Sequence, residues 1–110
     1  MTTIIYGGRA CGKTTALVKE AAATGAYIVC LTLQQVGNIL RCARNLNLHI
    51  LYPITADEFI SGNFNTHMKT PFLIDNVEDI IMRLARGCNV NTMTTCLPVE
   101  KISIDHLKEG

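Results

Sequence analysis

"IIYGGRACGKTT", residues 4–15, joins a short apolar run to a glycine-rich segment that ends in a lysine and two threonines. Residues 7–14 match the pattern G-x-x-x-x-G-K-[ST] without a gap. Such a segment binds phosphate when a buried strand precedes it and a helix follows it. Both conditions are met, because residues 2–6 have the pattern of a buried strand and residues 13–24 have helical periodicity. We therefore predict a phosphate-binding loop at the start of an α/β domain.

Each fixed position of this loop has a physical reason. Gly7 and Gly12 allow backbone angles and a close approach to phosphate that a Cβ atom would prevent. The backbone N–H groups of the loop then point inward as an anion-binding nest, and the following helix N-terminus favours negative charge there. Lys13 is expected to reach the β- and γ-phosphates as a catalytic residue, and the Thr14 hydroxyl to bind Mg²⁺. The residues predicted to bind the nucleotide are Gly7, Gly8, Arg9, Ala10, Cys11, Gly12, Lys13, Thr14 and Thr15.

The composition is that of a globular protein. With 110 residues, of which 48% are hydrophobic and 17% charged, the chain is predicted to form one domain over residues 1–110. A net charge of +1 without a basic cluster does not indicate nucleic-acid binding. The apolar runs are too short to span a bilayer and no signal peptide is expected, which favours a cytoplasmic protein without a membrane partner. The five cysteines form no C-x-x-C pair, which disfavours a zinc site and a disulfide framework.

Apolar runs and helical periodicity alternate along the chain. Strands are predicted at residues 2–6, 26–33, 49–53, 72–75 and 89–96, and helices at residues 13–24, 34–47, 55–62 and 76–87. Thr55 and Glu58 form a capping-box pattern at the start of the third helix, and residues 62–71 have the composition of a surface loop. The tail after Pro98 fits either one more strand or a short helix. This alternation predicts an α/β fold, a three-layer αβα sandwich with a mostly parallel five-stranded sheet.

Asp75 ends the predicted strand in "TPFLID". The carboxyl ends of parallel strands meet at one edge of a sheet, where open α/β sheets bind their ligands. A carboxylate there can hold Mg²⁺ through water while the Thr14 hydroxyl binds the ion directly. We therefore predict Thr14 and Asp75 as the metal site; the alternative is that Asp75 only caps the next helix.

The loop and "FLIDN" together resemble the Walker A and Walker B motifs of P-loop NTPases. The order of strands and motifs resembles the first RecA-like domain of superfamily 1 and 2 helicases and the ATPase of phage terminases. The resemblance covers nearly the whole chain in order, with the Walker A loop as its specific motif, and Thr94 or Thr95 matches the position of a sensor threonine. It implies a RecA-like P-loop fold that binds ATP with Mg²⁺, and an accessory protein of a phage or mobile element acting in the host cytoplasm.

The chain departs from these enzymes at the residue after the Walker B aspartate. They place there a glutamate that polarises the attacking water, whereas this chain has Asn76, which can orient water but cannot accept its proton. Glu78 is the candidate catalytic replacement; the alternative is that it complements the helix dipole. Asp79 is expected to be structural, capping with Asn76 and pairing with Arg83 four residues further on.

Two functions remain open from the sequence. The first is a Mg²⁺-dependent ATP-binding protein that hydrolyses the γ-phosphate slowly, completed by an arginine from a second subunit or partner protein. The second is a non-catalytic, nucleotide-responsive binding module that acts through a protein or nucleic-acid partner, which Asn76 favours. ATP is favoured over GTP because the chain has no Asn-Lys-x-Asp sequence. A small-molecule kinase is disfavoured because no segment with clustered arginines follows the predicted sheet.

Overall fold

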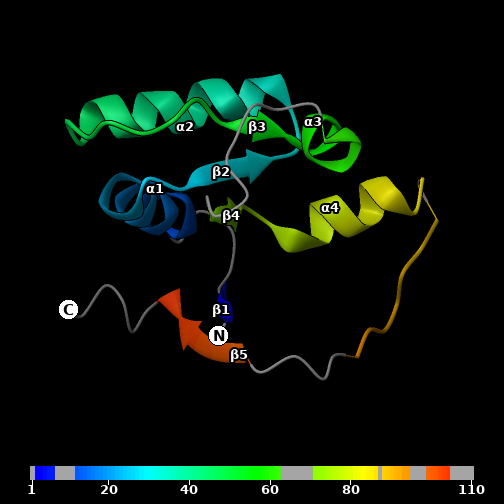
Figure 1. The fold of residues 1–110 in the computed structure, drawn as a ribbon. Helices are drawn as coiled ribbons and strands as arrows, with labels where there is room; N and C mark the ends of the chain where they lie inside the picture. Colours follow the sequence, from blue (N-terminus) through cyan, green and yellow to red (C-terminus); the bar gives the residue numbers. More distant parts are fainter. Residues whose placement is uncertain (1, 7–11, 63–70, 87, 95–98, 105–110) are drawn as a thin grey trace.

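The computed structural model describes residues 2–6, 12–62, 71–86, 88–94 and 99–104. Within these residues strands and helices alternate along the chain (Figure 1), which confirms the predicted α/β class. The elements are β1 (Thr2–Tyr6), α1 (Lys13–Thr24), β2 (Tyr27–Cys30), α2 (Leu33–Asn45), β3 (Ile54–Thr55), α3 (Ala56–Ser61), β4 (Phe72–Ile74), α4 (Val77–Leu84) and β5 (Val99–Ser103). Helix α1 has the predicted bounds, and Gly25 ends it in the left-handed conformation with φ 74°.

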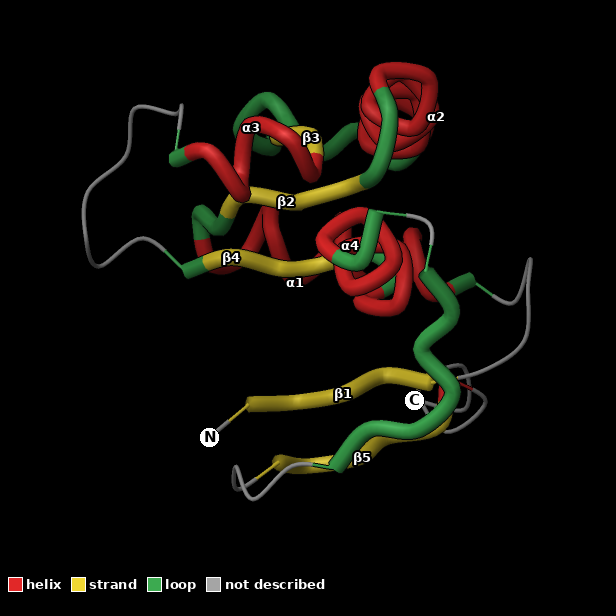
Figure 2. Tube along the Cα trace, turned by 90° about the vertical axis from the view of Figure 1, so that its right-hand side faces the viewer, coloured by secondary structure: helices red, strands yellow, loops and turns green. Residues whose placement is uncertain are grey.

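The strands form two parallel sheets. The central sheet has the order β3-β2-β4, and β1 pairs separately with β5, from Thr2 opposite Val99 to Tyr6 opposite Ser103. Figure 2 shows β1 and β5 below β2 and β4. The predicted single five-stranded sheet is therefore wrong, and so is the RecA-like arrangement that requires it. The physical reason is that β5 supplies backbone hydrogen-bond partners along the whole of β1, which a strand pattern alone does not specify.

Residues of β2 enter two different cores because successive side chains of a strand point to opposite faces. Ile28 and Cys30 pack against α1 and α2, whereas Val29 packs against α3 and α4. Helices thus contact β2 of the central sheet on both of its faces. The first core consists of Val18, Ala21, Ile28, Cys30, Val36, Ile39 and Ala43, and the second of Val29, Ala56 and Ile80.

Two predicted strands lie elsewhere. Residues 49–53 form no strand; β3 follows them as a two-residue strand, after Pro53, which has no N–H to donate to a ladder. Residues 89–94 form no strand either, and residues 95–96 lie outside the described residues. The last strand is instead β5, which confirms one of the two alternatives for the tail. The polar sequence of residues 89–94 explains the difference, because it offers few side chains to bury on a sheet.

The helix starts are set by local side-chain contacts. At α3, the Thr55 hydroxyl accepts from the Glu58 N–H and the Glu58 carboxylate accepts from the Thr55 N–H, which confirms the predicted capping box. A second capping box, between Thr32 and Gln35, begins α2 one residue before the predicted start. Gly62 ends α3 as predicted, and the rest of the predicted loop, residues 63–70, lies outside the described residues. Among the described residues, no helix is long and apolar enough to span a membrane.

Candidate functional site

The end of the predicted phosphate loop leads directly into α1. Gly7, Gly8, Arg9, Ala10 and Cys11 lie outside the described residues, and the description of the loop begins at Gly12. Gly12 has φ 94° and ψ 12°, a left-handed conformation that favours glycine, and its carbonyl accepts the first helical bond from the Ala16 N–H at 3.1 Å. The first turn of α1 carries no acidic residue. No acidic side chain of this turn therefore offsets the positive end of the helix dipole.

The two predicted metal ligands lie in contact. Strand β4 pairs with β2, and the Asp75 N–H extends that pairing by donating to the Val29 carbonyl at 2.9 Å. This bond places Asp75 immediately beyond the carboxyl end of β4. There the Thr14 hydroxyl of α1 donates to Asp75 Oδ2 at 3.0 Å. Residues from the two sequence motifs thus meet at one edge of the central sheet.

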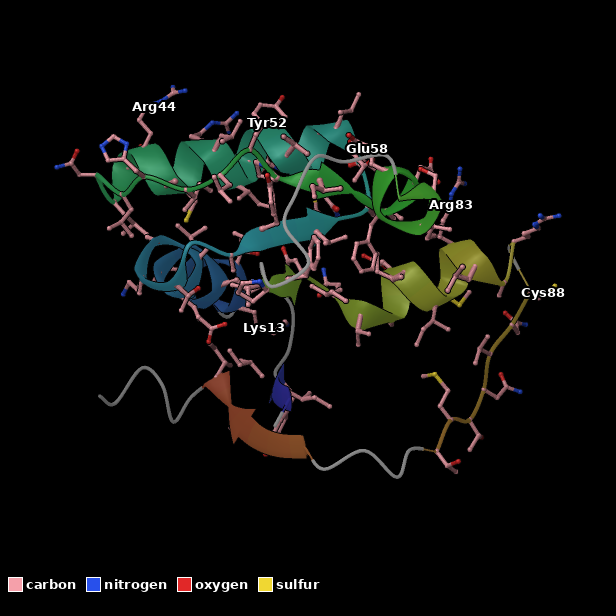
Figure 3. The ribbon with its side chains drawn as sticks, in the orientation of Figure 1. Lys13, Arg44, Tyr52, Glu58, Arg83 and Cys88 are labelled. Atoms are coloured by element: carbon pink, nitrogen blue, oxygen red, sulfur yellow. The ribbon has the colours of Figure 1, made fainter. Side chains whose placement is uncertain are left out.

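The surroundings of Asp75 raise the pKa of its carboxyl group. Burial is the main cause that raises its pKa, and the negative charge of Glu78 adds to that effect. The hydrogen bond from Thr14 and the positive charge of Lys13 act in the opposite direction. Lys13 lies at the start of α1 (Figure 3), and its positive charge acts on Asp75. The site thus combines a half-buried carboxylate, a hydroxyl and an ammonium group.

The donor set fits magnesium rather than a softer metal. A carboxylate and a hydroxyl are hard oxygen donors, which Mg²⁺ prefers, and Mg²⁺ commonly takes one or two protein oxygens with water and phosphate completing its shell. Among the described residues, no group of three or more His, Cys, Asp and Glu side chains is arranged to hold a metal ion. Thr14 and Asp75 supply two hard oxygen donors that lie 3.0 Å apart.

Asn76 and Glu78 follow the site on the chain. Asn76 precedes α4 as its N-cap residue, but its side chain makes no capping hydrogen bond, and its backbone is left-handed with φ 63° and ψ 79°. The predicted side-chain capping by Asn76 is therefore wrong, because the backbone carbonyl of Asn76, not its amide, accepts from the Asp79 N–H at 2.9 Å. Glu78 is exposed in the first turn of α4, where its charge reaches Asp75.

Three further predicted residues have other surroundings. The Thr15 hydroxyl lies 3.7 Å from the Cys42 thiol of α2, so its contact with an α-phosphate stays a prediction. Thr94 is exposed and belongs to no strand, and Thr95 lies outside the described residues.

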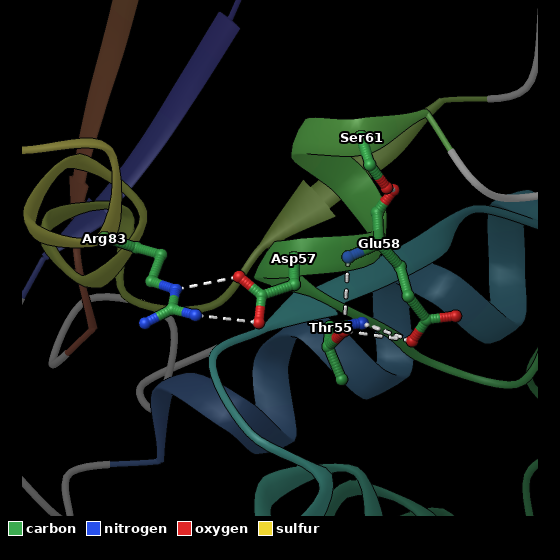
Figure 4. A network of polar contacts seen from close by, with 5 residues as sticks. All are labelled: Thr55, Asp57, Glu58, Ser61 and Arg83. Carbon is green, nitrogen blue, oxygen red and sulfur yellow. Dashed lines mark hydrogen bonds and ion pairs between the residues drawn. The ribbon is translucent and has the colours of Figure 1, made fainter. Parts of the chain in front are cut away.

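Arg83 forms a bidentate ion pair with Asp57 of α3. Its Nε lies 2.7 Å from Oδ1 and its Nη2 lies 3.0 Å from Oδ2 (Figure 4). Both side chains are exposed, and the hydrogen bond from Arg83 holds the pKa of Asp57 below its usual value. The sequence predicted the local partner Asp79 for Arg83. The structure gives it a partner 26 residues away because α3 and α4 pack on the same face of the sheet.

A cavity of about 630 Å³ opens at the carboxyl ends of β2 and β3. Helix α2 leaves β2 on one face of the sheet and α3 leaves β3 on the other, an arrangement that open α/β sheets use for ligand binding. This cavity could not be predicted from the sequence, because three separate segments of the chain line it. The lining residues are Leu31, Thr32, Leu33, Thr55, Asp57, Glu58, Asp79, Met82 and Arg83.

The chain was compared with protein-family models, with curated proteins and with solved structures, and none of the three comparisons gave a match.

Proposed function

We propose that this chain is a P-loop nucleotide-binding protein that binds ATP together with Mg²⁺. The observation that carries the proposal is the 3.0 Å contact between the Thr14 hydroxyl and Asp75 Oδ2. Thr14 follows the lysine of the phosphate-loop pattern, and Asp75 directly follows the parallel strand β4. A chance glycine-rich turn would give no reason for these two oxygens to meet at the carboxyl edge of the sheet.

The expected binding mode follows from the elements around this pair. The N–H groups of residues 8–14 and the positive end of α1 would hold the phosphates, and Lys13 would reach the β- and γ-phosphate oxygens. Thr14 would bind Mg²⁺ directly and Asp75 would hold it through water. Bound Mg²⁺ would neutralise charge on the β- and γ-phosphates. The left-handed Gly12 keeps a Cβ atom away from the phosphate path.

Slow hydrolysis of the γ-phosphate is the catalytic form of this proposal. Glu78 is the candidate general base, since its carboxylate lies near enough to influence Asp75. Glu78 is exposed to solvent, so the hydrolysis that we propose is slow. Completion of the site by a second subunit or partner protein would supply the missing arginine.

The second candidate is a non-catalytic module in which ATP binding alters affinity for a protein or nucleic-acid partner. Asn76 favours this reading, because a carboxamide cannot accept a proton from water. The two candidates share the same binding site and differ only in turnover.

One set of measurements separates these outcomes. ATP and GTP affinities are measured by calorimetry with MgCl₂ or EDTA, phosphate release is followed over hours, and Lys13→Ala and Glu78→Gln are compared with the wild type. Lys19→Ala is the matched control, since Lys19 is an exposed lysine of the same helix. At a hundred times its Kd, MgATP should stabilise the wild type by about 2.7 kcal/mol. Lys13→Ala should lose at least about tenfold in affinity, which corresponds to about 1.4 kcal/mol.

The possible results lead to different conclusions. Binding without phosphate release supports the module and excludes the ATPase. Release that both Lys13→Ala and Glu78→Gln abolish supports the ATPase and excludes the pure binding module. If neither ATP nor GTP binds with Mg²⁺, the proposed function is wrong.

A further inference from the structure

Asn76 has a backbone conformation that most residues avoid. It lies between the end of β4 and the start of α4 with φ 63° and ψ 79°, and its side chain makes no capping hydrogen bond. Asparagine tolerates this left-handed region better than other residues with a Cβ atom, and glycine tolerates it best. The conformation therefore depends on which residue occupies position 76.

Backbone hydrogen bonds fix the chain before and after the Cα atom of Asn76. On one side, the Asp75 N–H donates to the Val29 carbonyl at 2.9 Å and keeps the strand end in the sheet. On the other side, the Asn76 carbonyl accepts from the Asp79 N–H at 2.9 Å and starts α4. Ile80 of α4 is buried in the core that also contains Val29. Residues 75 and 76 make the turn between these fixed points, and the positive φ lies at residue 76, directly next to the carboxylate that contacts Thr14.

If residue 76 left the left-handed region, one of these two backbone hydrogen bonds would have to break. Loss of the bond between Asp75 and Val29 would move Asp75 relative to Thr14. Loss of the bond between Asn76 and Asp79 would move α4 away from Val29. A glutamate here would meet the same backbone cost. It would also add a third carboxylate beside Asp75 and Glu78, which already repel each other electrostatically.

We propose that Asn76 is a positioning residue whose left-handed turn aims the Asp75 carboxylate at Thr14. The identity of residue 76 is then set by backbone geometry and not by catalysis. This role rests on the proposed MgATP function and specifies how its metal site is held. It implies that Mg²⁺ strengthens ATP binding most when residue 76 adopts the left-handed conformation at low energetic cost.

The test compares Asn76→Gly, Asn76→Ala and Asn76→Glu in the full chain. The readout is the ratio of the ATP Kd in EDTA to the ATP Kd in MgCl₂, which isolates the metal-dependent part of binding from overall stability. We expect Asn76→Gly to keep this ratio within about threefold of the wild type, and Asn76→Ala and Asn76→Glu to lower it about tenfold, or ~1.4 kcal/mol. We expect no gain of phosphate release in Asn76→Glu.

Asn47→Ala is the matched control. Asn47 is the other described asparagine with positive φ, at 57°, and it lies exposed in the turn after α2. Asn47→Ala should lower the melting temperature about as much as Asn76→Ala, because both positions have a positive φ. It should leave the Kd ratio unchanged. Melting curves of every variant establish that the chain is folded at the assay temperature, and the Gly variant keeps the test informative if Ala or Glu unfolds it.

Three results would overturn the inference. Equal Kd ratios for the wild type, Asn76→Ala and Asn76→Glu would make Asn76 a merely structural residue. A gain of phosphate release in Asn76→Glu of tenfold or more would show that position 76 is catalytic. A wild type whose ATP affinity does not depend on Mg²⁺ would overturn the proposed function itself, and with it this role.

Discussion

The Thr14 hydroxyl donates a hydrogen bond of 3.0 Å to Asp75 Oδ2, although 61 residues separate them along the chain. This bond joins the first turn of α1 to the end of β4. The carboxylate it reaches is one that burial penalises, so the hydroxyl compensates part of a cost that the fold imposes. The fold thus keeps a partly buried carboxylate in contact with a hydroxyl and within reach of the charge of Lys13.

We predict that Asp75→Asn stabilises the ligand-free protein and removes its Mg²⁺ dependence. The amide keeps the shape of the side chain and can still accept from Thr14, but it has no charge to bury. Thermal unfolding at pH 7 should show an increase of about 2–5 °C, since about 0.5–1 kcal/mol shifts the melting temperature by this amount in a domain of this size. An unchanged or lower melting temperature, or a retained Mg²⁺ effect on ATP affinity, would contradict the prediction.

The raised pKa of Asp75 also predicts the pH dependence of the wild type. The folded chain binds this proton more tightly than the unfolded chain, because burial disfavours the charged carboxylate. Between the unfolded and the folded pKa the native state carries more protons, so the contribution of Asp75 to stability falls as the pH rises through that window. Mg²⁺ requires the deprotonated form, so its effect on ATP affinity should weaken as the pH falls. Comparison of wild type with Asp75→Asn, by urea unfolding from pH 4 to pH 7, isolates this contribution; parallel curves would refute it.

Replacement of Thr14 tests the other side of the same contact. Thr14→Val keeps the branched shape but removes the hydroxyl, and we expect a loss of about 1–2 kcal/mol in stability because a half-buried carboxylate loses a hydrogen bond. The Mg²⁺-dependent part of ATP binding should be lost as well. Thr14→Ser, which keeps a hydroxyl, should remain within a few-fold of the wild type in Mg²⁺-dependent affinity. Serine and valine variants with the same affinity would argue against a metal role for Thr14.

Local signals in the sequence were sufficient to predict helix α1, the capping box of α3 and the end of β4. The bounds of α1, the capping box of Thr55 and Glu58, and the position of Asp75 at the end of a strand each depend on residues close together in sequence. The meeting of Thr14 with Asp75 also follows from a general property of parallel strands, since their carboxyl ends share one edge of the sheet.

Contacts between segments far apart in the sequence could not be predicted from these local signals. The apolar pattern of residues 2–6 predicts a strand but does not say whether its neighbour is β4 or β5. The ion pair of Arg83 with Asp57 depends on the packing of α3 beside α4, whereas sequence spacing offers only the local partner Asp79. The left-handed turn at Asn76 was missed for a different reason: asparagine fits both a cap and a left-handed turn, and only the backbone distinguishes them.

The two sheets should differ in their contribution to stability. Ile28 of β2 is 1% exposed between α1 and α2, whereas Ile4 of β1 is 37% exposed. We expect Ile28→Ala to cost about 2–5 kcal/mol, as for other buried isoleucines, and Ile4→Ala to cost less than about 1 kcal/mol. Urea unfolding measures the free energy of unfolding of both variants, and the substitution, isoleucine to alanine, is the same at the two positions. Similar costs at both positions would mean that β1 belongs to the main core.

The two capping boxes offer a final comparison, because they use the same hydrogen-bond pattern at different depths. Thr55 is 9% exposed and starts a six-residue helix, whereas Thr32 is exposed and starts a thirteen-residue helix. Thr55→Ala removes the acceptor for the Glu58 N–H and leaves a group with little access to water (Figure 4). We expect it to cost about 1–2 kcal/mol, and Thr32→Ala about 0.5–1 kcal/mol, since water can replace the lost partner of an exposed cap. Urea unfolding of Thr55→Ser and Thr32→Ser, which keep the hydroxyl, should recover most of each loss; a larger cost at Thr32 than at Thr55 would show that burial does not control the strength of these caps.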